Sequence, residues 1–266
     1  MTTIALTIAG SDPSGGAGIQ ADLKTFAAHG VYGASVITAL TAQNTTGVFG
    51  IHGVPPDFIR AQAEAVLSDL HVDCIKVGML GDRATIEVVA EILEAHASIP
   101  VVLDPVMVTA SGDLLLASDA VDTLLQRLLP LARLITPNVH EAGLLLGEPP
   151  ADSLGAMERQ ALALRDLGAH AVLLKGGRRG DVSTSTDVLC TADAAEWLEA
   201  PRVAIERPHG TGCTLSSAIA AQLALGRALR DAVLEGKRYV TAALERASRV
   251  SIGHGSRPLI HADGER

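Results

Sequence analysis

Short apolar runs alternate along the chain with longer runs in which hydrophobic residues recur at helical spacing. A short continuous apolar run is typical of a strand that is buried on both faces of a sheet. Hydrophobic recurrence every three or four residues, as at Leu23, Phe26 and Ala27, is typical of a helix with one buried face. We therefore expect strands at residues 4–9, 33–40, 74–77, 101–103, 134–135 and 171–174. We expect helices at residues 19–28, 57–70, 83–95, 119–129, 154–167, 215–225 and 231–249, and a further helix that begins at Asn138.

This order of elements predicts the fold class. Strands that alternate with helices of this length form βαβ units, and such units build a mostly parallel sheet with helices on both faces. No linker, repeat or low-complexity segment divides the chain, so we expect residues 1–266 to form one doubly wound α/β domain. Residues 187–190 and 197–205 are expected to form a small antiparallel excursion. The polar loop 178–186 is a candidate mobile flap.

Composition and charge narrow the function classes. A net charge of −9 argues against a nucleic-acid surface, and an aromatic content of 2% leaves few side chains on which bases could stack. The three cysteines are widely spaced and form no Cys-x-x-Cys pair, which is typical of reduced thiols in the cytosol. The apolar start has no basic flank and is too short for a signal peptide or a membrane span. We expect a cytoplasmic protein that binds neither nucleic acid nor membrane.

The segment His-Gly-Thr-Gly-Cys-Thr at residues 209–214 has the pattern of an anion site. Gly210 and Gly212 allow a tight turn, and the helix that follows directs its unpaired N–H groups and the positive end of its dipole at that turn. Thr211 and Thr214 are candidate caps. A helix N-terminus also lowers the pKa of a thiol, which would activate Cys213. The alternative interpretation is a capped helix with a buried cysteine.

Polar side chains follow the predicted strands at the edge where the carboxyl ends of parallel strands meet, which is where such sheets bind ligands. Phosphoryl transfer needs carboxylates for Mg²⁺, donors for the phosphates and a base near the acceptor hydroxyl. We assign Asp104 and Glu141 to Mg²⁺, Lys175 to phosphate, the amides of residues 210–213 to the transferring group, and Cys213 to the base. Each residue also has a structural explanation: Asp104 suits a turn, and Asn138 with Glu141 suits a capping box.

The glycine loop near the N-terminus matches Gly-x-Gly-x-x-Ala at residues 16–21, the pattern of a dinucleotide-binding turn. That pattern requires an acid at the end of the second strand, and residues 36–40 contain none. No Gly-Lys-Ser/Thr follows, so the loop is not a Walker A motif. We interpret it as a loop that closes over a small substrate. Asp22 is then a hydrogen-bonding carboxylate or simply an acid near a helix N-terminus.

Residues 6–25, LTIAGSDPSGGAGIQADLKT, closely resemble the opening of the hydroxymethylpyrimidine/phosphomethylpyrimidine kinases of thiamin biosynthesis, in the ribokinase superfamily. The resemblance continues in order through residues 36–44, 76–80, 103–107, 135–141, 174–177 and 209–214. It implies a three-layer α/β/α fold and a homodimer. It also implies that ATP·Mg²⁺ phosphorylates 4-amino-5-hydroxymethyl-2-methylpyrimidine and then converts its monophosphate to the pyrophosphate.

The resemblance also implies roles for individual residues. Gln43 would read the amino edge of the pyrimidine and Met79 would pack on its face. Cys213 stands where most members of the superfamily carry Asp. The remaining assignments place Gly10, Asp22, Val106 and His209 with Gln43 and Met79 at the pyrimidine, and Asn138, Lys175 and Thr211 at ATP.

Related pyridoxal kinases share this scaffold but carry a second cysteine shortly after the Asp-Pro-Val-Met segment, and residues 106–111 contain none. This favours the pyrimidine and leaves pyridoxal kinase as the alternative.

The chain departs from many pyrimidine kinases at Ala110, where Lys is common, and at Arg178, where His is common. A nicotinamide oxidoreductase is disfavoured, because this chain lacks the acid that such an enzyme needs after its second strand. A non-catalytic binding protein is disfavoured, because it would not need Asp104, Glu141, Lys175 and Cys213 together. No histidines have zinc-ligand spacing, and Lys237 is interpreted as a solvated helix lysine in preference to a neighbour of the adenine.

Overall fold

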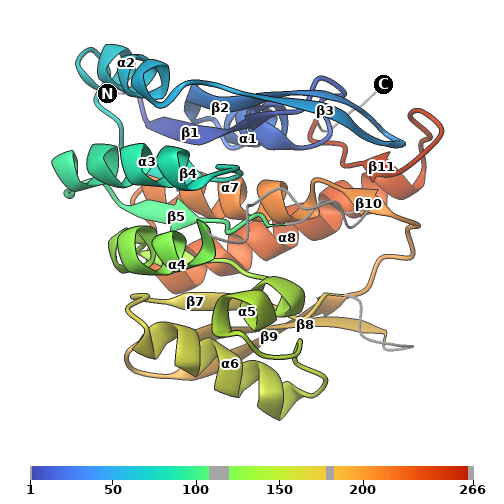
Figure 1. The fold of residues 1–266 in the computed structure, drawn as a ribbon. Coiled ribbons are helices and arrows are strands. Elements are labelled where there is room, and N and C mark those ends of the chain that lie inside the picture. Colours follow the sequence, from blue (N-terminus) through green and yellow to red (C-terminus); the bar gives the residue numbers. More distant parts are fainter. Residues whose placement is uncertain (1, 108–119, 178–182, 263–266) are drawn as a thin grey trace.

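A computed structural model of the chain describes residues 2–107, 120–177 and 183–262. These residues contain a nine-stranded sheet with the order β3-β2-β1-β4-β5-β6-β7-β8-β9 (Figure 1). The central strands are parallel, and the strands at the two edges are antiparallel. The parallel strands are β1 (Ile4–Ser11), β2 (Tyr32–Asn44), β4 (Cys74–Val77), β5 (Val101–Leu103), β6 (Leu134–Ile135) and β7 (Val172–Lys175). The antiparallel strands are β3 (Gly47–Gly53), β8 (Thr184–Cys190) and β9 (Ala195–Pro201).

Helices cover both faces of this sheet and give three layers (Figure 1). Successive side chains of a strand point to opposite faces, so Leu6 and Ile8 of β1 join one hydrophobic core while Ala5 joins the other. On the first face lie α2 (Pro56–Leu67), α3 (Arg83–Ala95), α5 (Val139–Leu146) and α6 (Leu154–Asp166), with the short helical turns α4 (Val121–Thr123), η2 (Leu124–Leu128) and η3 (Leu129–Leu131). On the second face lie α1 (Gly18–Ala28), α7 (Thr211–Ala224) and α8 (Leu229–Ser248).

The architecture confirms the expected α/β class, and most predicted elements are present within a few residues of their expected bounds. Two predictions differ from the structure. The strands β8 and β9 are not a small excursion, because β8 pairs with β7 and both extend the main sheet, while residues 202–205 are not part of a strand. The expected helix at 119–129 is described only from residue 120, and there it is a short α-helical turn followed by π-helical and 3₁₀ turns.

Several elements were not predicted. The strand β3 forms an antiparallel hairpin with the long second half of β2. A separate two-stranded sheet joins β10 (Pro208–His209) to β11 (Arg257–Pro258) in parallel. This second sheet is important for the site because it connects the segment before α7 to the C-terminal part of the chain. No helix among the described residues is long and apolar enough to span a membrane.

Candidate active site

A cavity of about 1160 Å³ lies at the carboxyl edge of the parallel strands and at the N-terminus of α7. Binding at this edge is expected, because the loops that leave parallel strands diverge there and open a crevice. All but one of the predicted site residues line the cavity. Those residues are Gly10, Gln43, Met79, Asp104, Val106, Asn138, Glu141, Lys175, His209, Gly210, Thr211, Gly212 and Cys213.

The turn before α7 requires glycine. Gly210 has φ of 78°, a left-handed conformation that residues with a Cβ rarely adopt. A Cβ at this position would also lie 1.8 Å from the carbonyl oxygen of Gly16. The N–H of Thr214 donates to the carbonyl oxygen of Gly210 at 2.9 Å and so begins the helix. The loop that contains Gly16 and the turn that contains Gly210 are therefore tightly packed against each other. The unpaired amides of the first turn of α7 lie at this junction, beside the cavity.

The two threonines of this turn do not cap the helix, contrary to the prediction. The N-cap residue is Gly210, and no side chain makes a capping hydrogen bond there. The hydroxyl oxygens of Thr211 and Thr214 are buried and have no hydrogen-bond partner among the described residues. Thr211 lines the cavity, and the backbone of the turn does not use its hydroxyl.

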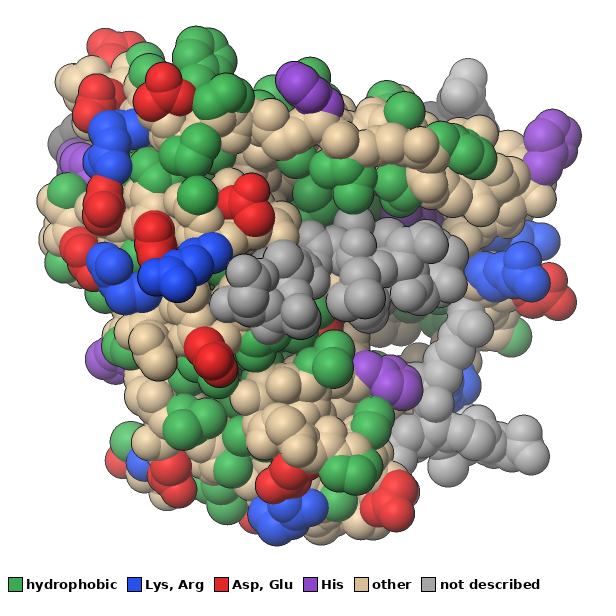
Figure 2. Space-filling view, viewed as in Figure 1, with side chains coloured by type: hydrophobic (Ala, Val, Ile, Leu, Met, Phe, Trp, Pro, Cys, Tyr) green, Lys and Arg blue, Asp and Glu red, His purple; other side chains and the backbone are tan. Residues whose placement is uncertain are grey.

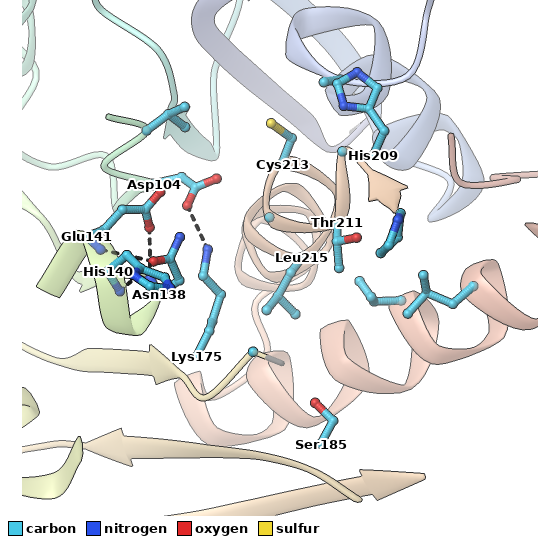
Figure 3. Close-up of a pocket in the computed structure, with 18 of the residues that line it drawn as sticks. Asp104, Asn138, His140, Glu141, Lys175, Ser185, His209, Thr211, Cys213 and Leu215 are labelled. Atoms are coloured by element: carbon cyan, nitrogen blue, oxygen red, sulfur yellow. Dashed lines mark hydrogen bonds and ion pairs between the residues drawn. The ribbon is translucent and has the colours of Figure 1, made fainter. Parts of the chain in front are cut away.

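Asp104 and Lys175 form an ion pair opposite the first turn of α7 (Figure 3). Lys175 Nζ lies 3.1 Å from Asp104 Oδ1, and a Cβ at Gly212 would lie 3.2 Å from Lys175 Nζ and 3.5 Å from Asp104 Oδ2. Thr136 and Ser216 also donate to Asp104, at 3.0 and 3.3 Å. Burial alone would raise the pKa of Asp104, but Lys175 and Lys76 lower it below its usual value. The carboxylate therefore stays charged beside the glycine turn.

Glu141 forms the predicted capping box and also faces the cavity. Its Oε2 accepts the N–H of Asn138 at 2.7 Å, while Asn138 Oδ1 accepts the N–H groups of His140 and Glu141, so the capping box is present. Glu141 also lines the cavity. Burial raises its pKa to about 7; the charge of Lys175 opposes this rise and that of Asp104 adds to it. A cation bound near Asp104 and Glu141 would favour the charged carboxylate.

The donor set at this end suits Mg²⁺ better than a transition metal. The described residues hold no group of three or more His, Cys, Asp or Glu side chains that could bind a metal. Mg²⁺ in kinase sites is held through one or two carboxylates together with water and substrate phosphates. Asp104 and Glu141 provide two carboxylates. The Thr211 hydroxyl has no hydrogen-bond partner among the described residues, and the glycines of the turn have no side chains that would exclude phosphate oxygens.

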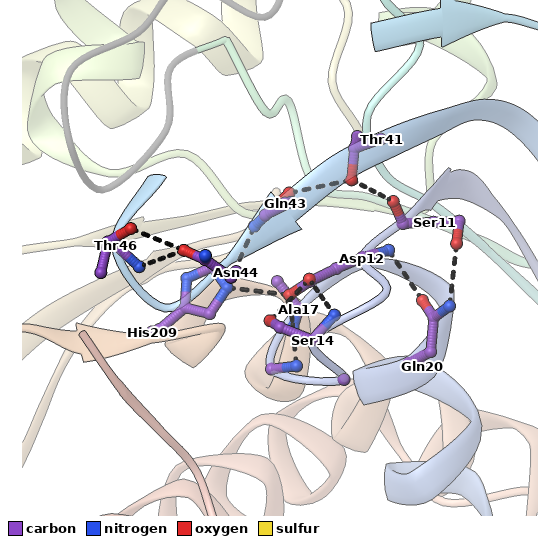
Figure 4. A network of polar contacts seen from close by, with 12 residues as sticks. Ser11, Asp12, Ser14, Ala17, Gln20, Thr41, Gln43, Asn44, Thr46 and His209 are labelled. Carbon is purple, nitrogen blue, oxygen red and sulfur yellow. Dashed lines mark hydrogen bonds and ion pairs between the residues drawn. The ribbon is translucent and has the colours of Figure 1, made fainter. Parts of the chain in front are cut away.

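At the other end of the cavity, Asp12 organises the N-terminal glycine loop (Figure 4). Its Oδ1 accepts the N–H and the hydroxyl of Ser14, and its Oδ2 accepts the N–H of Ala17 at 2.8 Å. His209 Nε2 lies 2.9 Å from Asp12 Oδ2 and 3.3 Å from Gln43 Nε2. Burial would raise the pKa of Asp12, but the hydrogen bonds from His209 and Ser14 lower it to about 2. The charged Asp12 thus holds His209 beside Gln43.

Asp22 is the predicted pyrimidine residue that the structure places elsewhere. Its side chain is fully buried and does not line the cavity. Both of its carboxylate oxygens lie 2.9 Å from Lys76 Nζ, and the hydroxyls of Thr7 and Ser217 donate to it at 2.7 Å. Lys76 does line the cavity. Burial lowers its pKa, but the negative charges around it, with Asp22 first, together outweigh burial and raise the pKa. Asp22 therefore acts on the cavity through Lys76.

Cys213 lies in the first turn of α7, as predicted, but its thiol is not activated in this structure. Burial raises the pKa of the Cys213 thiol to about 11, and the charge of Lys76 only partly opposes this effect. The expected lowering by the helix N-terminus is therefore wrong for the described state. The reason is that desolvation of this half-buried thiol on the cavity wall, together with the negative charges of Asp22 and Asp104, penalises the thiolate more than the helix favours it.

Sequence reasoning missed much of the wall on the α8 side. Lys237 is buried, lines the cavity and forms an ion pair with Asp187 of β8, so the interpretation as a solvated lysine is wrong. The only sequence signal for Lys76 was a lysine within an otherwise apolar strand. The apolar wall had no signal, because it is assembled from segments far apart in the chain; its members include Val203, Ile205, Leu215, Val240 and Leu244. Ala110 and residues 178–182 of the proposed flap, including Arg178, lie outside the described residues.

The family comparison matches this chain to the Phosphomethylpyrimidine kinase model over residues 12–259. A hydroxymethylpyrimidine/phosphomethylpyrimidine kinase of Rhizobium meliloti is 52% identical over 262 residues, which are 98% of this chain and 97% of that protein.

Solved structures show the same fold. A phosphomethylpyrimidine kinase of Clostridium difficile is 41% identical with a TM-score of 0.81, and the match covers 91% of this chain and 100% of that one. An ADP complex of Bacillus subtilis pyridoxal kinase is 35% identical with a TM-score of 0.89, and the match covers 98% of both chains. The chain is thus similar both to pyrimidine kinases and to a pyridoxal kinase.

Proposed function

The chain belongs to the phosphomethylpyrimidine kinase family, and from this membership we propose that it is the bifunctional kinase that phosphorylates 4-amino-5-hydroxymethyl-2-methylpyrimidine and then its monophosphate. ATP is the phosphoryl donor, and the pyrophosphate product serves thiamine biosynthesis. The observation that carries this proposal is that the family match spans nearly the whole chain and includes the cavity with Asp104, Lys175 and Cys213 on its wall. Residues 1–266 act as one kinase domain, in the cytoplasm.

The pyrimidine binds at the end of the cavity formed by β1, β2 and β4. Gly10 leaves room for the Met79 side chain, since a Cβ there would lie 3.1 Å from Met79 Cε. Met79 packs on the face of the pyrimidine, and the carboxamide of Gln43 reads its amino edge. His209 is held beside Gln43 by Asp12, and Val106 closes the same end. These groups would orient the hydroxymethyl arm toward the first turn of α7.

The phosphates bind at that turn. The amides of residues 210–213 and the Lys175 ammonium neutralise the transferring phosphoryl group, as donors placed where charge develops do in such reactions. The acceptor oxygen forms a bond to the γ-phosphorus, the bond to the bridging oxygen breaks, and ADP leaves. Cys213 Sγ, as thiolate, accepts the proton of the acceptor hydroxyl. Lys76, held by Asp22, stabilises that thiolate.

ATP occupies the end of the cavity near α8. Asn138, Lys175 and Thr211 contact its phosphates, and the apolar wall that includes Leu215 and Val240 receives the adenine. Asp104 and Glu141 would hold Mg²⁺, which supplies charge neutralisation at the phosphate oxygens when bound. The hydroxyl of Thr211, buried and without a partner among the described residues, supports a ligand at this position.

Pyridoxal kinase is the second candidate, because the Bacillus subtilis pyridoxal kinase has this fold at a TM-score of 0.89. The absence of a cysteine at residues 106–111 favours the pyrimidine. Initial rates with ADP detection, for hydroxymethylpyrimidine and pyridoxal in parallel, separate the two. We expect a kcat/KM at least about 100-fold higher for the pyrimidine. Comparable or faster pyridoxal turnover would overturn the substrate assignment and leave the ATP site standing.

The same proposal includes a homodimer. Large hydrophobic side chains are exposed around the β2–β3 hairpin, among them Leu40, Phe49 and Ile51, and hydrophobic side chains show at the β2–β3 end of the molecule in Figure 2. A strand at a sheet edge with such side chains suits burial against a second copy of the chain. Light scattering after gel filtration should give twice the chain mass, and Phe49→Asp should shift the protein toward the monomer.

A further inference from the structure

The C-terminal tail, defined here as residues 253–261, contacts each of the three segments that build the pyrimidine end of the cavity. These segments are the glycine loop after β1, the end of β2 with Gln43, and the short strand β10 with His209. None of the tail residues lines the cavity. The tail therefore touches the residues around the pyrimidine without touching the pyrimidine.

The first contact is with Thr45, two residues after Gln43. The N–H groups of His254 and Gly255 donate to Thr45 Oγ1, each at 3.2 Å, and the N–H of Ser256 donates to the Thr45 carbonyl oxygen at 2.6 Å. A Cβ at Gly255 would lie 2.0 Å from that carbonyl oxygen, so the approach requires glycine. The tail thus fixes the turn between β2 and β3 directly beyond Gln43.

The second and third contacts are made by β11. Its residues pair in parallel with β10, Arg257 with Pro208 and Pro258 with His209, and the Arg257 N–H donates to the carbonyl oxygen of Arg207 at 2.9 Å. Pro258 also packs against the glycine loop, because a Cβ at Gly16 would lie 3.0 Å from Pro258 Cβ and 2.5 Å from His209 Cδ2. The backbone that carries His209 is thereby held between β11 and the glycine loop.

The end of the tail is anchored in the body of the protein. Leu259 is buried in the core beneath α1, α7 and α8. The buried His261 lies with Nδ1 3.3 Å from the Thr25 hydroxyl of α1, and the Tyr239 hydroxyl of α8 donates to the His261 carbonyl oxygen at 3.2 Å. Arg246 Nε donates to the Ile260 carbonyl oxygen at 3.0 Å. An anchor at one end allows the rest of the tail to hold the three segments in fixed positions relative to one another.

We propose that the C-terminal tail is a positioning element for the pyrimidine, with Pro258 and His261 acting as positioning residues through His209 and the glycine loop. It sets the distance between Gln43 and His209 and so adjusts affinity for the acceptor. Of the residues proposed to contact ATP, Asn138 and Lys175 lie on segments for which no hydrogen bond or strand pairing to the tail is present among the described residues. This inference rests on the proposed function, because it assigns the pyrimidine to the end of the cavity that these segments form.

Three variants test the proposal by calorimetric titration of hydroxymethylpyrimidine and, separately, of a nonhydrolysable ATP analogue. Thr45→Val removes the acceptor of two tail N–H groups at a half-buried surface position, where folding is not at risk. His261→Ala releases the anchor, and His261→Asn keeps a polar atom near the position of Nδ1. We expect Thr45→Val and His261→Ala to raise the Kd of the pyrimidine about tenfold, the effect of weakening one hydrogen bond to a ligand. The Kd of the ATP analogue should stay within about twofold, and His261→Asn should restore most of the pyrimidine affinity.

The matched control is Leu164→Ala, which opens the core on the opposite face of the sheet without contact to the tail. A structural defect alone would make His261→Ala behave like this control, with parallel changes for both ligands. That result, or an unchanged pyrimidine Kd in both tail variants, would overturn the role of the tail. Wild-type protein that bound no pyrimidine would instead overturn the proposed function.

Discussion

At the scale of single residues, the site is governed by a few buried charges whose partners are all provided by the chain. Asp104 is paired with Lys175, Asp22 with Lys76, and Asp12 with His209. Each carboxylate lies at or behind the cavity wall and keeps a cation or an imidazole in a fixed position. A buried ion pair contributes little net stability but defines geometry, because losing either partner leaves an uncompensated charge. The buried ion pairs therefore fix the arrangement of charges in the site and add little to the stability of the fold.

Cys213 is the first residue at which this account can be tested. Cys213→Ala should lose most turnover, by about 100-fold or more if the thiolate is the general base, with ATP affinity little changed. Cys213→Asp should retain measurable activity, because a carboxylate can accept the same proton without activation. Steady-state rates and titration of an ATP analogue check both statements. Near-normal turnover of Cys213→Ala would show that the residue is only a spacer beside the amides.

The raised pKa of Cys213 predicts a pH dependence with a definite sign. Because the pKa is about 11, the thiolate fraction rises with pH throughout the range 8 to 10, by about tenfold per unit. Turnover of the wild-type enzyme should rise over this range. In Cys213→Asp the same profile should be flat, because its carboxylate is already ionised. A flat wild-type profile would mean either that another group is the base or that chemistry does not limit the rate.

Asp22 separates a structural from a substrate-binding role. Asp22→Asn leaves the fully buried Lys76 ammonium without its counter-ion and should lower the free energy of unfolding by about 3–5 kcal/mol. The double variant Asp22→Leu with Lys76→Met removes both charges and should recover much of that loss. Urea unfolding measures both. If Asp22→Asn kept full stability and only weakened pyrimidine binding, the carboxylate would face the substrate, as the family resemblance implied.

At the scale of elements, the junction between the glycine loop and α7 is the feature that tolerates substitution least. Gly210 and Gly226 offer a matched comparison, since both have φ of 78° but only Gly210 is crowded; nothing among the described residues would lie within 4 Å of a Cβ at Gly226. The two positions thus share the left-handed φ, and only Gly210 would clash with Gly16.

Gly210→Ala should therefore reduce kcat/KM by about 100-fold or more, because the amides of the first turn must move to relieve the contact with the Gly16 carbonyl oxygen. Gly226→Ala should cost about 1–2 kcal/mol of stability from the left-handed backbone and leave kcat/KM near that of the wild type. Rates and unfolding midpoints measured on both variants check the comparison. Equal losses of activity would mean that strain, and not the junction, controls the site.

The sequence predicted elements well where their pattern was local. The strand at residues 74–77 and the helix at 83–95 match the structure, because a continuous apolar run and a helical period each record burial directly. The strand β3 escaped notice because Gly47, Gly50 and Gly53 and its mostly exposed residues resemble a loop. The two-residue strands β10 and β11 are too short to show a periodicity, and they form by pairing with each other across a long separation in sequence.

At the scale of the whole molecule, the cavity combines two chemically different ends. One end is polar and holds Gln43 and His209; the other is lined by the ion pair of Lys237 with Asp187 and by apolar side chains near α8. The segment 209–213 contributes residues to both, since His209 contacts Gln43 and Gly212 faces Lys175. An acceptor and a donor bound at the two ends would meet at the N-terminus of α7.

Topology explains which site residues were predictable. Asp104, Asn138 and Lys175 lie at or just beyond the carboxyl ends of parallel strands, so their meeting at one edge follows from the fold class. Lys237 and the apolar wall depend on how α8 packs beside β9 and α7, which no local pattern records. Charge states were also unpredictable, because the pKa of Cys213 depends on burial and on Lys76, and neither can be read from the Gly-Thr-Gly-Cys motif.

The central claim is that one cavity performs both phosphorylations. Phosphorus NMR of the protein with hydroxymethylpyrimidine, ATP and Mg²⁺ tests it directly, because the signals of the monophosphate and the pyrophosphate are resolved from those of ATP and ADP. We predict that the monophosphate appears first and is then consumed as the pyrophosphate accumulates, and that Lys175→Ala slows both steps. Absence of the pyrophosphate, or a second step insensitive to Lys175→Ala, would contradict the claim.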